Sequence, residues 1–170
     1  TVITPGTEFM EKLNNKIINH FKKKKNKKIK ITLSSYHVPG EGEHKILKDI
    51  RNKTQLNQDN TYVIYGLDAD LIFLALASQK SNIYLLREET EIKKKNNILK
   101  DENDIEEDLI FVSIDEMKKS YVNQIKELII VGSNNKMIGF NFDGNKLIND
   151  FIFISFFLGN VFLPHIPSIN

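Results

Sequence analysis

Helical and strand patterns alternate along the first half of the chain, and this order constrains the fold more than any other feature. Apolar residues recur at steps of three or four over 7–21 and predict an amphipathic helix. The patterns that follow predict a strand over 29–33, a helix over 44–56, a strand over 61–65, a helix that begins near residue 68, and a strand over 83–86. Such alternation is typical of an α/β fold, so we expect a mainly parallel sheet with flanking helices.

The second half of the chain is less regular. Residues 90–110 are polar and charged, with six acids between Asp101 and Asp108, and indicate a loop or insertion. Beyond them we predict a helix over 114–125, a short strand over 128–131, a turn-rich stretch over 143–149 and a buried apolar segment over 150–158.

Composition excludes several classes of protein. The 170 residues include no Cys, so neither a disulfide framework nor a thiolate metal site is possible. The net charge of +2 does not indicate a nucleic-acid binder, and the seven lysines over 22–30 are read as solvated surface, with phosphate contact as the alternative. No signal peptide is visible in 1–10, and the apolar run over 151–158 is far shorter than the roughly 20 residues of a membrane span.

Two acidic pairs lie where one predicted element ends and the next begins. Glu41 and Glu43 flank a glycine in a turn rich in Pro and Gly, and Asp68 and Asp70 follow the predicted strand 61–65. In open α/β sheets, ligands bind beyond the carboxyl ends of the strands. Four carboxylates that converged there would repel one another unless a cation such as Mg²⁺ or Mn²⁺ neutralised them. Two such ions would suit phosphodiester hydrolysis.

Each of these residues also has a simpler interpretation. Glu41 and Glu43 are acids that the dipole of a helix start favours, Asp68 is a possible N-cap, and Asp70 is a possible first-turn acid. The neighbouring His44 and Lys45 would suit phosphate binding, but a helix-start His and an exposed Lys are common without any such role. His165 receives no role from its spacing.

Five stretches together resemble the Xrn-type 5′→3′ exoribonucleases, in the order of that family. They are ITPGTEFM at 3–10, VPGEGEHK at 38–45, YGLDADLI at 65–72, Arg-Glu-Glu at 87–89, and the segment 151–168 with its GN and LPHIPS elements. VPGEGEHK and YGLDADLI form the most specific pair. The resemblance is weak over 90–110 and 126–149.

The resemblance implies a PIN-like or flap-nuclease-like α/β core followed by a helical region. It divides the chain into 1–89 (end of the nuclease region), 90–110 (charged insertion) and 111–170 (start of the helical region). It implies an intracellular enzyme, cytoplasmic or nuclear, that hydrolyses single-stranded RNA bearing a 5′-monophosphate with Mg²⁺ or Mn²⁺. Glu41, Glu43, Asp68 and Asp70 would be its metal-site carboxylates.

One departure from the family pattern bears on activity. Val161 stands where the resemblance places a further metal-site Asp. The upstream part of the family pattern is also missing, so we expect an internal fragment that is a poor nuclease on its own. The alternatives are a degenerate remnant that binds RNA or protein, and a structure-specific DNA nuclease of the flap type. We also expect poor solubility, because Phe151, Phe153, Phe156 and Phe157 would lack partners.

Overall fold

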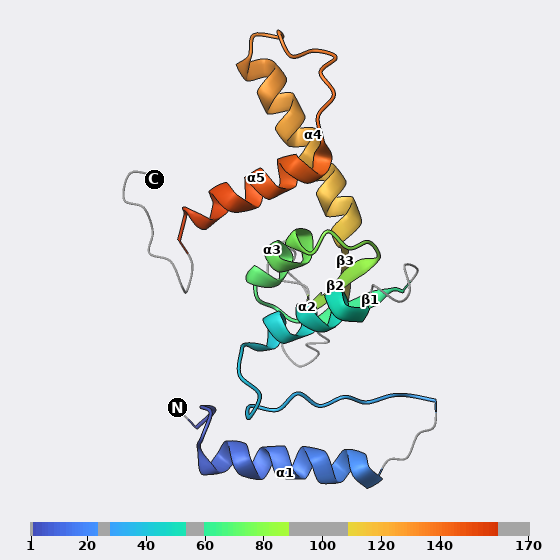
Figure 1. The fold of residues 1–170 in the computed structure, drawn as a ribbon, viewed down its shortest axis with the longest axis vertical. Helices are drawn as coiled ribbons and strands as arrows, with labels where there is room; N and C mark the ends of the chain where they lie inside the picture. The colour runs from blue at the N-terminus through green and yellow to red at the C-terminus, as the bar shows by residue number, and fades with distance from the viewer. Residues whose placement is uncertain (1, 24–27, 54–59, 89–108, 160–170) are drawn as a thin grey trace, which may run out of the picture. The chain divides into compact units, whose positions relative to one another are not determined.

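The chain folds into two compact units, each of which is described on its own. The computed structural model describes residues 2–23, 28–53, 60–88 and 109–159 (Figure 1). The first unit is Thr1–Ile46 and the second is Leu47–Asn170. The charged stretch over 90–108, with its six acids, lies outside the described residues.

The first unit consists of helix α1 (Glu8–Lys23) and the irregular segment that follows it. Thr7 caps α1, because its hydroxyl oxygen accepts a hydrogen bond from the Met10 amide at 3.4 Å. The helix predicted over 7–21 is therefore confirmed. The strand predicted over 29–33 is wrong: these residues lie in no strand of the described chain, and their apolar side chains are exposed. Alternation alone does not make a strand, since a ladder needs a partner.

Helix α2 (Gly42–Lys53) begins in the first unit and continues into the second. In the second unit, β1 (Tyr62–Tyr65), β2 (Ile83–Glu88) and β3 (Leu109–Ser113) form a sheet of order β1-β2-β3. β1 and β2 are parallel, whereas β2 and β3 are antiparallel, so the described sheet is mixed rather than mainly parallel. The strand β3 was missed in the sequence, because it directly follows the charged stretch and leads straight into a helix.

Three more helices complete the second unit: α3 (Asp70–Ala77), α4 (Ile114–Gly132) and α5 (Gly144–Phe156). The strand predicted over 128–131 is wrong, since these residues form the end of α4. The turn-rich stretch predicted over 143–149 is also wrong, because Asp143 caps α5 by accepting hydrogen bonds from the Asn145 and Lys146 amides at 2.9 and 3.3 Å. Helix α5 therefore starts at this cap, where the sequence predicted a turn.

The core lies on one face of the sheet. Ile64, Ile83 and Leu85 share this face by the strand register, and the helices bury them there. The helical side chains of this core are Leu47, Ile50, Leu71, Ala75, Leu76, Ile114, Ile148 and Ile152. On the opposite face Val63, Tyr65 and Phe111 remain 54%, 60% and 64% exposed. The sheet is thus apolar on both faces, and the core occupies only one of them.

Helix α5 shows the same one-sided burial. Phe151 packs against Tyr121, with ring centroids 5.1 Å apart, whereas Phe153, Phe156 and Phe157 are exposed. The apolar segment predicted to be buried is therefore buried along one stripe only, and poor solubility stays a prediction. Among the described residues, no helix combines the length and the apolar character needed to cross a membrane.

The buried face of β2 gives a direct test of this packing. We predict that Leu85→Ala lowers the free energy of unfolding by about 2–5 kcal/mol, because Leu85 is fully buried and its truncation leaves a cavity. Urea denaturation followed by circular dichroism measures this change. Leu128→Ala is the matched control, since Leu128 is 71% exposed and its truncation should change stability little. Equal effects of the two substitutions would contradict the assignment of the core.

Candidate metal site

The turn before α2 places the first acidic pair at a helix start. Gly40 has a φ of +101°, a conformation that favours glycine, and it directly precedes Glu41. The Glu41 carbonyl accepts a hydrogen bond from the Lys45 amide at 3.1 Å, so Glu41 stands at the N-cap of α2. Glu43 and His44 then follow in its first turn. Local turn chemistry therefore puts all three side chains at one end of one helix.

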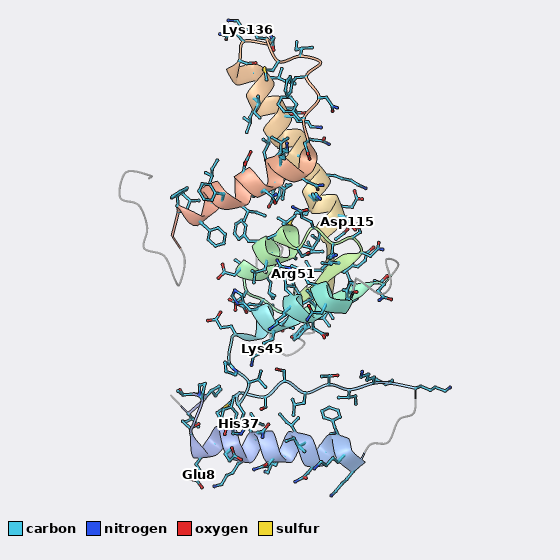
Figure 2. All side chains as sticks on the ribbon, in the orientation of Figure 1. Glu8, His37, Lys45, Arg51, Asp115 and Lys136 are labelled. Carbon is cyan, nitrogen blue, oxygen red and sulfur yellow. The ribbon has the colours of Figure 1, made fainter. Side chains whose placement is uncertain are left out.

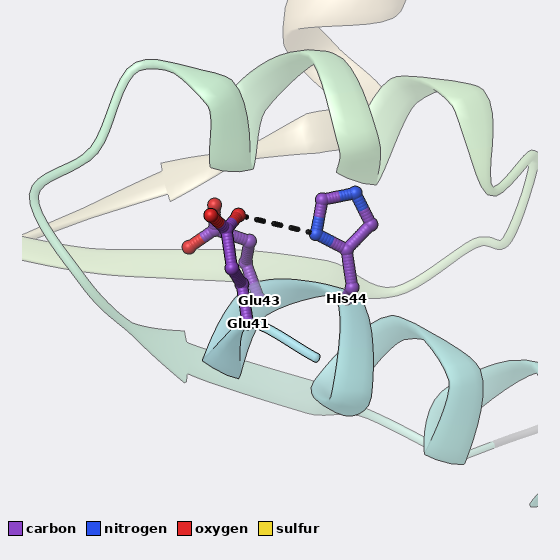
Figure 3. A group of neighbouring side chains, drawn as sticks. All are labelled: Glu41, Glu43 and His44. Atoms are coloured by element: carbon purple, nitrogen blue, oxygen red, sulfur yellow. Dashed lines mark ion pairs between the residues drawn. The ribbon is translucent and has the colours of Figure 1, made fainter. Parts of the chain in front are cut away.

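The side chains of Glu41, Glu43 and His44 form a compact group, which Figure 3 shows. One ligand atom from each lies within 4.8 Å of the other two. The Glu41 carboxylate is 3.6 Å from Nδ1 of His44, and both side chains are about half exposed. Carboxylates suit Mg²⁺ and Mn²⁺, and Mg²⁺ is usually held by only one or two carboxylates together with water. The two carboxylates of this group therefore fit a hard divalent cation.

Helix electrostatics also favour these acids without any metal. The amino end of a helix carries partial positive charge, which stabilises a carboxylate in the first turn. The position of Glu41 and Glu43 at the start of α2 thus agrees with both interpretations of the sequence. What the helix start does not require is a histidine nitrogen within 4.8 Å of both acids.

The second acidic pair follows β1 in the second unit. Asp68 is exposed, and the half-buried Asp70 is the first residue of α3. The N-cap of α3 is Ala69, without a side-chain hydrogen bond, so the interpretation of Asp68 as an N-cap is wrong. Neither carboxylate forms a hydrogen bond or ion pair with a residue that the structure describes.

The loop that carries Asp68 is fastened to the sheet. The Gly66 amide donates to the Leu86 carbonyl at 3.3 Å, and the Arg87 guanidinium donates to the carbonyl of Leu67. A β-carbon at Gly66 would overlap the buried side chain of Leu71, so the backbone approaches α3 more closely than other residues allow. The sheet and α3 together determine where this loop runs.

The structure brings some of the predicted site residues together within each unit. Glu41, Glu43 and His44 form a group in the first unit, and in the second unit Asp68 lies in the loop after β1 while Asp70 begins α3. The convergence of all four carboxylates stays a prediction. Lys45, predicted to contact phosphate, donates from Nζ to the Ser35 carbonyl at 3.3 Å, so it has a protein partner.

Glu11 of α1 is a feature that the sequence reading missed. Its carboxylate accepts a hydrogen bond from the Tyr36 hydroxyl and lies 3.2 Å from Nε2 of His37. Figure 2 shows His37, in the segment that leads to α2, beside α1. An acid on a solvated helix gives no local sign of such a contact, because its partners are about 25 residues further along the chain.

This contact shifts two titrations in opposite directions. The hydrogen bond from Tyr36 lowers the pKa of Glu11 below its ordinary value of 4.5, with smaller contributions from Asn15 and His37. The same hydrogen bond raises the pKa of Tyr36 above its ordinary value of 10.0. Both groups thus keep the protonation states that the contact needs at neutral pH.

Family profiles and relatives cover nearly the whole chain. The profile described as XRN 5′-3′ exonuclease N-terminus matches residues 1–89, and that of the Xrn1 helical domain matches 141–170. The chain belongs to the XRN 5′-3′ exonuclease family. The resemblance seen in the sequence motifs is therefore confirmed.

Relatives within this family share about a third of the residues. The chain is 36% identical to 5′-3′ exoribonuclease 2 of Saccharomyces cerevisiae, over 99% of this chain and 18% of the relative. It is 36% identical to 5′-3′ exoribonuclease 1 of the same yeast, over 99% of this chain and 11% of the relative. It is 34% identical to 5′-3′ exoribonuclease 2 of Schizosaccharomyces pombe, over 99% and 19%. The chain thus spans less than a fifth of the length of these relatives.

The XRN match places the candidate residues within one region of the family. The profile of the exonuclease N-terminus includes Glu41, Glu43, Asp68 and Asp70, as well as Glu11. Val161 and His165 fall in the match to the helical domain, and both lie outside the described residues.

The contact of Glu11 with Tyr36 predicts a measurable titration. We expect Glu11→Gln to lower the pKa of Tyr36 toward 10.0, because the substitution removes the carboxylate charge that opposes loss of the phenol proton. Ultraviolet absorbance of tyrosinate between pH 9 and 12 measures it, with Tyr36→Phe identifying the Tyr36 component. An unchanged titration curve would contradict the contact.

The same contact predicts how stability depends on pH. Because the folded pKa of Tyr36 is raised, its contribution to stability is complete below pH 10.0 and is lost as pH rises through the folded pKa. Because the folded pKa of Glu11 is lowered, its contribution is complete above 4.5 and is lost as pH falls through the folded pKa.

The close approach at Gly66 gives a separate prediction. We expect Gly66→Ala to lower the free energy of unfolding by about 1–3 kcal/mol, because the added methyl group overlaps Leu71. The matched control is Gly132→Ala at the end of α4, where a β-carbon meets no atom within 4 Å and stability should not fall. Chemical denaturation measures both, and equal stability of the two variants would contradict the predicted overlap.

Proposed function

We propose that the protein hydrolyses single-stranded RNA in the 5′→3′ direction from a 5′-monophosphate, releasing nucleotides by a two-metal mechanism. The observation that carries this proposal is the group of Glu41, Glu43 and His44 in a member of the XRN 5′-3′ exonuclease family. The relatives are named 5′-3′ exoribonuclease 1 and 2, which supports RNA as the substrate.

In this proposal the four carboxylates bind metal rather than attack the substrate. Glu41 and Glu43 of the first unit and Asp68 and Asp70 of the second would each be metal ligands. Bound Mg²⁺ or Mn²⁺ would supply an activated water and charge stabilisation for the leaving oxygen. The half exposure of Glu41 and the exposure of Asp68 support access for a polymeric substrate.

The residues beside the carboxylates have supporting roles. His44 lies next to Glu41 and presents a second ring nitrogen, Nε2, that would suit a hydrogen bond to a phosphate oxygen. Lys45 would add positive charge near the same place while its Nζ remains bonded to the Ser35 carbonyl. We assign both residues to substrate binding and not to proton transfer.

The wider architecture belongs to the same proposal. We assign 1–89 to the end of a PIN-like nuclease region, 90–110 to an insertion and 111–170 to the start of the helical region. The family matches at 1–89 and 141–170 support the first and last assignments. An intracellular place of action, in cytoplasm or nucleus, fits a substrate that is RNA.

Val161 favours a second candidate function. It stands where the motif resemblance places an acid, and a Val side chain offers no oxygen to a metal. Loss of one ligand lowers the affinity for the metal and loosens the positions of the remaining ligands. The second candidate is therefore a non-catalytic remnant that binds RNA or a protein partner.

The proposed activity predicts dependence on the 5′ end, on metal and on the acids. We expect a full-length form to degrade 5′-monophosphorylated RNA faster than 5′-hydroxyl RNA in Mn²⁺. Asp68→Asn and Glu43→Gln should each lower the rate by about a hundredfold or more, because each removes a negative charge from the metal site. Gel analysis of end-labelled RNA measures the rates, with Glu127→Gln, an exposed acid on α4, as the control.

The outcomes separate the two candidates. Equal rates on both 5′ ends, or activity in excess chelator, would contradict the exonuclease. Absence of activity together with metal-independent RNA binding would support the remnant. Calorimetric Mn²⁺ binding that Asp68→Ala and Asp70→Ala abolish would argue against the remnant.

A further inference from the structure

We infer that Glu11 is a positioning residue for the group of Glu41, Glu43 and His44, which it reaches through the segment that leads into that group. The inference rests on the proposed function, because it concerns how the same site is held. It is argued entirely within the first unit, from contacts between α1, the segment 35–41 and the start of α2.

The Glu11 carboxylate uses both of its oxygens. Oε1 accepts a hydrogen bond from Asn15 Nδ2 at 3.0 Å, while Oε2 accepts from the Tyr36 hydroxyl and lies 3.2 Å from His37 Nε2. The rings of Tyr36 and His37 also stack, with centroids 4.1 Å apart at 31°. One carboxylate therefore fixes two consecutive side chains of the segment to α1.

The side chain of Glu11 is 48% exposed, and a buried residue lies beside it on α1. Asn14 follows three residues later and so lies on the same side of the helix. It is the buried residue of α1, at 9% exposure, and its Oδ1 accepts no hydrogen bond within the part of the chain that the structure describes. The contact of Glu11 with Tyr36 and His37 is thus a junction beside the buried part of α1.

Ser35, which directly precedes Tyr36, is bonded to α2. Lys45 Nζ donates to the Ser35 carbonyl at 3.3 Å, and the Val38 amide donates to the same carbonyl at 3.1 Å. Lys45 directly follows His44, and only Pro39 and Gly40 separate Val38 from Glu41. Proline restricts the backbone of that short link. A shift of Ser35 would therefore act on both sides of the acidic group, through Lys45 and through the link.

The contacts of Glu11 indicate an indirect role and not direct metal binding. The residues whose ligand atoms come together within 4.8 Å, in the part of the chain that the structure describes, are Glu41, Glu43 and His44. The Glu11 oxygens face donors from Asn15, Tyr36 and His37 instead. Glu11 would therefore act on the group through Tyr36 and His37, which precede it in the segment.

The test measures Mn²⁺ affinity by calorimetry with the purified full chain. Glu11→Ala should weaken Mn²⁺ binding by about tenfold. Glu11→Gln should restore part of the affinity, because an amide oxygen still accepts from the Tyr36 hydroxyl. Glu8→Ala is the matched control on the same helix, since Glu8 is exposed and pairs with Lys12 at 2.6 Å, and it should leave the affinity unchanged.

A double-mutant cycle identifies the path. Tyr36→Phe keeps the ring but removes the hydroxyl donor, so it should weaken Mn²⁺ binding as well. The effects of Glu11→Ala and Tyr36→Phe should fall short of additive, because both break one contact. Full additivity would overturn the path through Tyr36.

The outcomes also distinguish this inference from the proposed site. If the unmodified chain binds Mn²⁺, Glu43→Gln abolishes binding and Glu11→Ala changes nothing, the positioning role is overturned and the site stands. If the unmodified chain does not bind Mn²⁺, both are overturned. If Glu11→Ala weakens binding only as far as it unfolds the chain, judged by circular dichroism and by the Glu11→Gln variant, the positioning role is overturned.

Discussion

Burial of the central strand β2 under helices is the constraint on which the second unit depends. Ile83 and Leu85 are fully buried, and full burial of such a side chain contributes about 1.5–3 kcal/mol. β1 pairs with β2 in parallel register, so the loop after β1 inherits its position from the same contact. The hydrogen bonds of the Gly66 amide and the Arg87 guanidinium then connect the residues beside Asp68 to β2.

The sheet is covered unequally. Parallel strands usually have both faces buried, which is why they are apolar on both sides. Here the helices bury Ile64 and Leu85, while Val63, Tyr65 and Phe111 stay exposed on the other face. Helix α5 repeats the pattern, with Ile148 and Ile152 buried and Phe153 exposed. The apolar content of these elements therefore exceeds what the described core uses.

The acidic residues illustrate how one local arrangement serves two physical needs. A carboxylate at the start of α2 is stabilised by the helix itself, and the same position brings Glu41 close to Glu43 and His44. Like charges at such a distance repel, and a divalent cation would reverse that cost. The Glu11 carboxylate also joins α1 to Tyr36 and His37, the residues that precede the turn before α2.

The sequence by itself determined the elements whose signals are local. The spacing of Met10, Leu13 and Ile17 predicted α1, and the glycines around Glu41 predicted the turn before α2. The motifs VPGEGEHK and YGLDADLI identified the family, because a run of specific residues can be recognised without any knowledge of the fold.

Only the tertiary structure decided the features that join distant residues. Among the described residues, 29–33 pair with no strand despite their strand pattern. β3, in contrast, is a strand because it pairs with the edge of β2. The apolar run over 128–131 fits a strand or a buried helix equally well, and continuity with α4 resolved it. The contact of Glu11 with Tyr36 spans 25 residues, so no local pattern records it. Periodicity reports which side of an element is apolar, but pairing and packing depend on what the rest of the chain presents to that side.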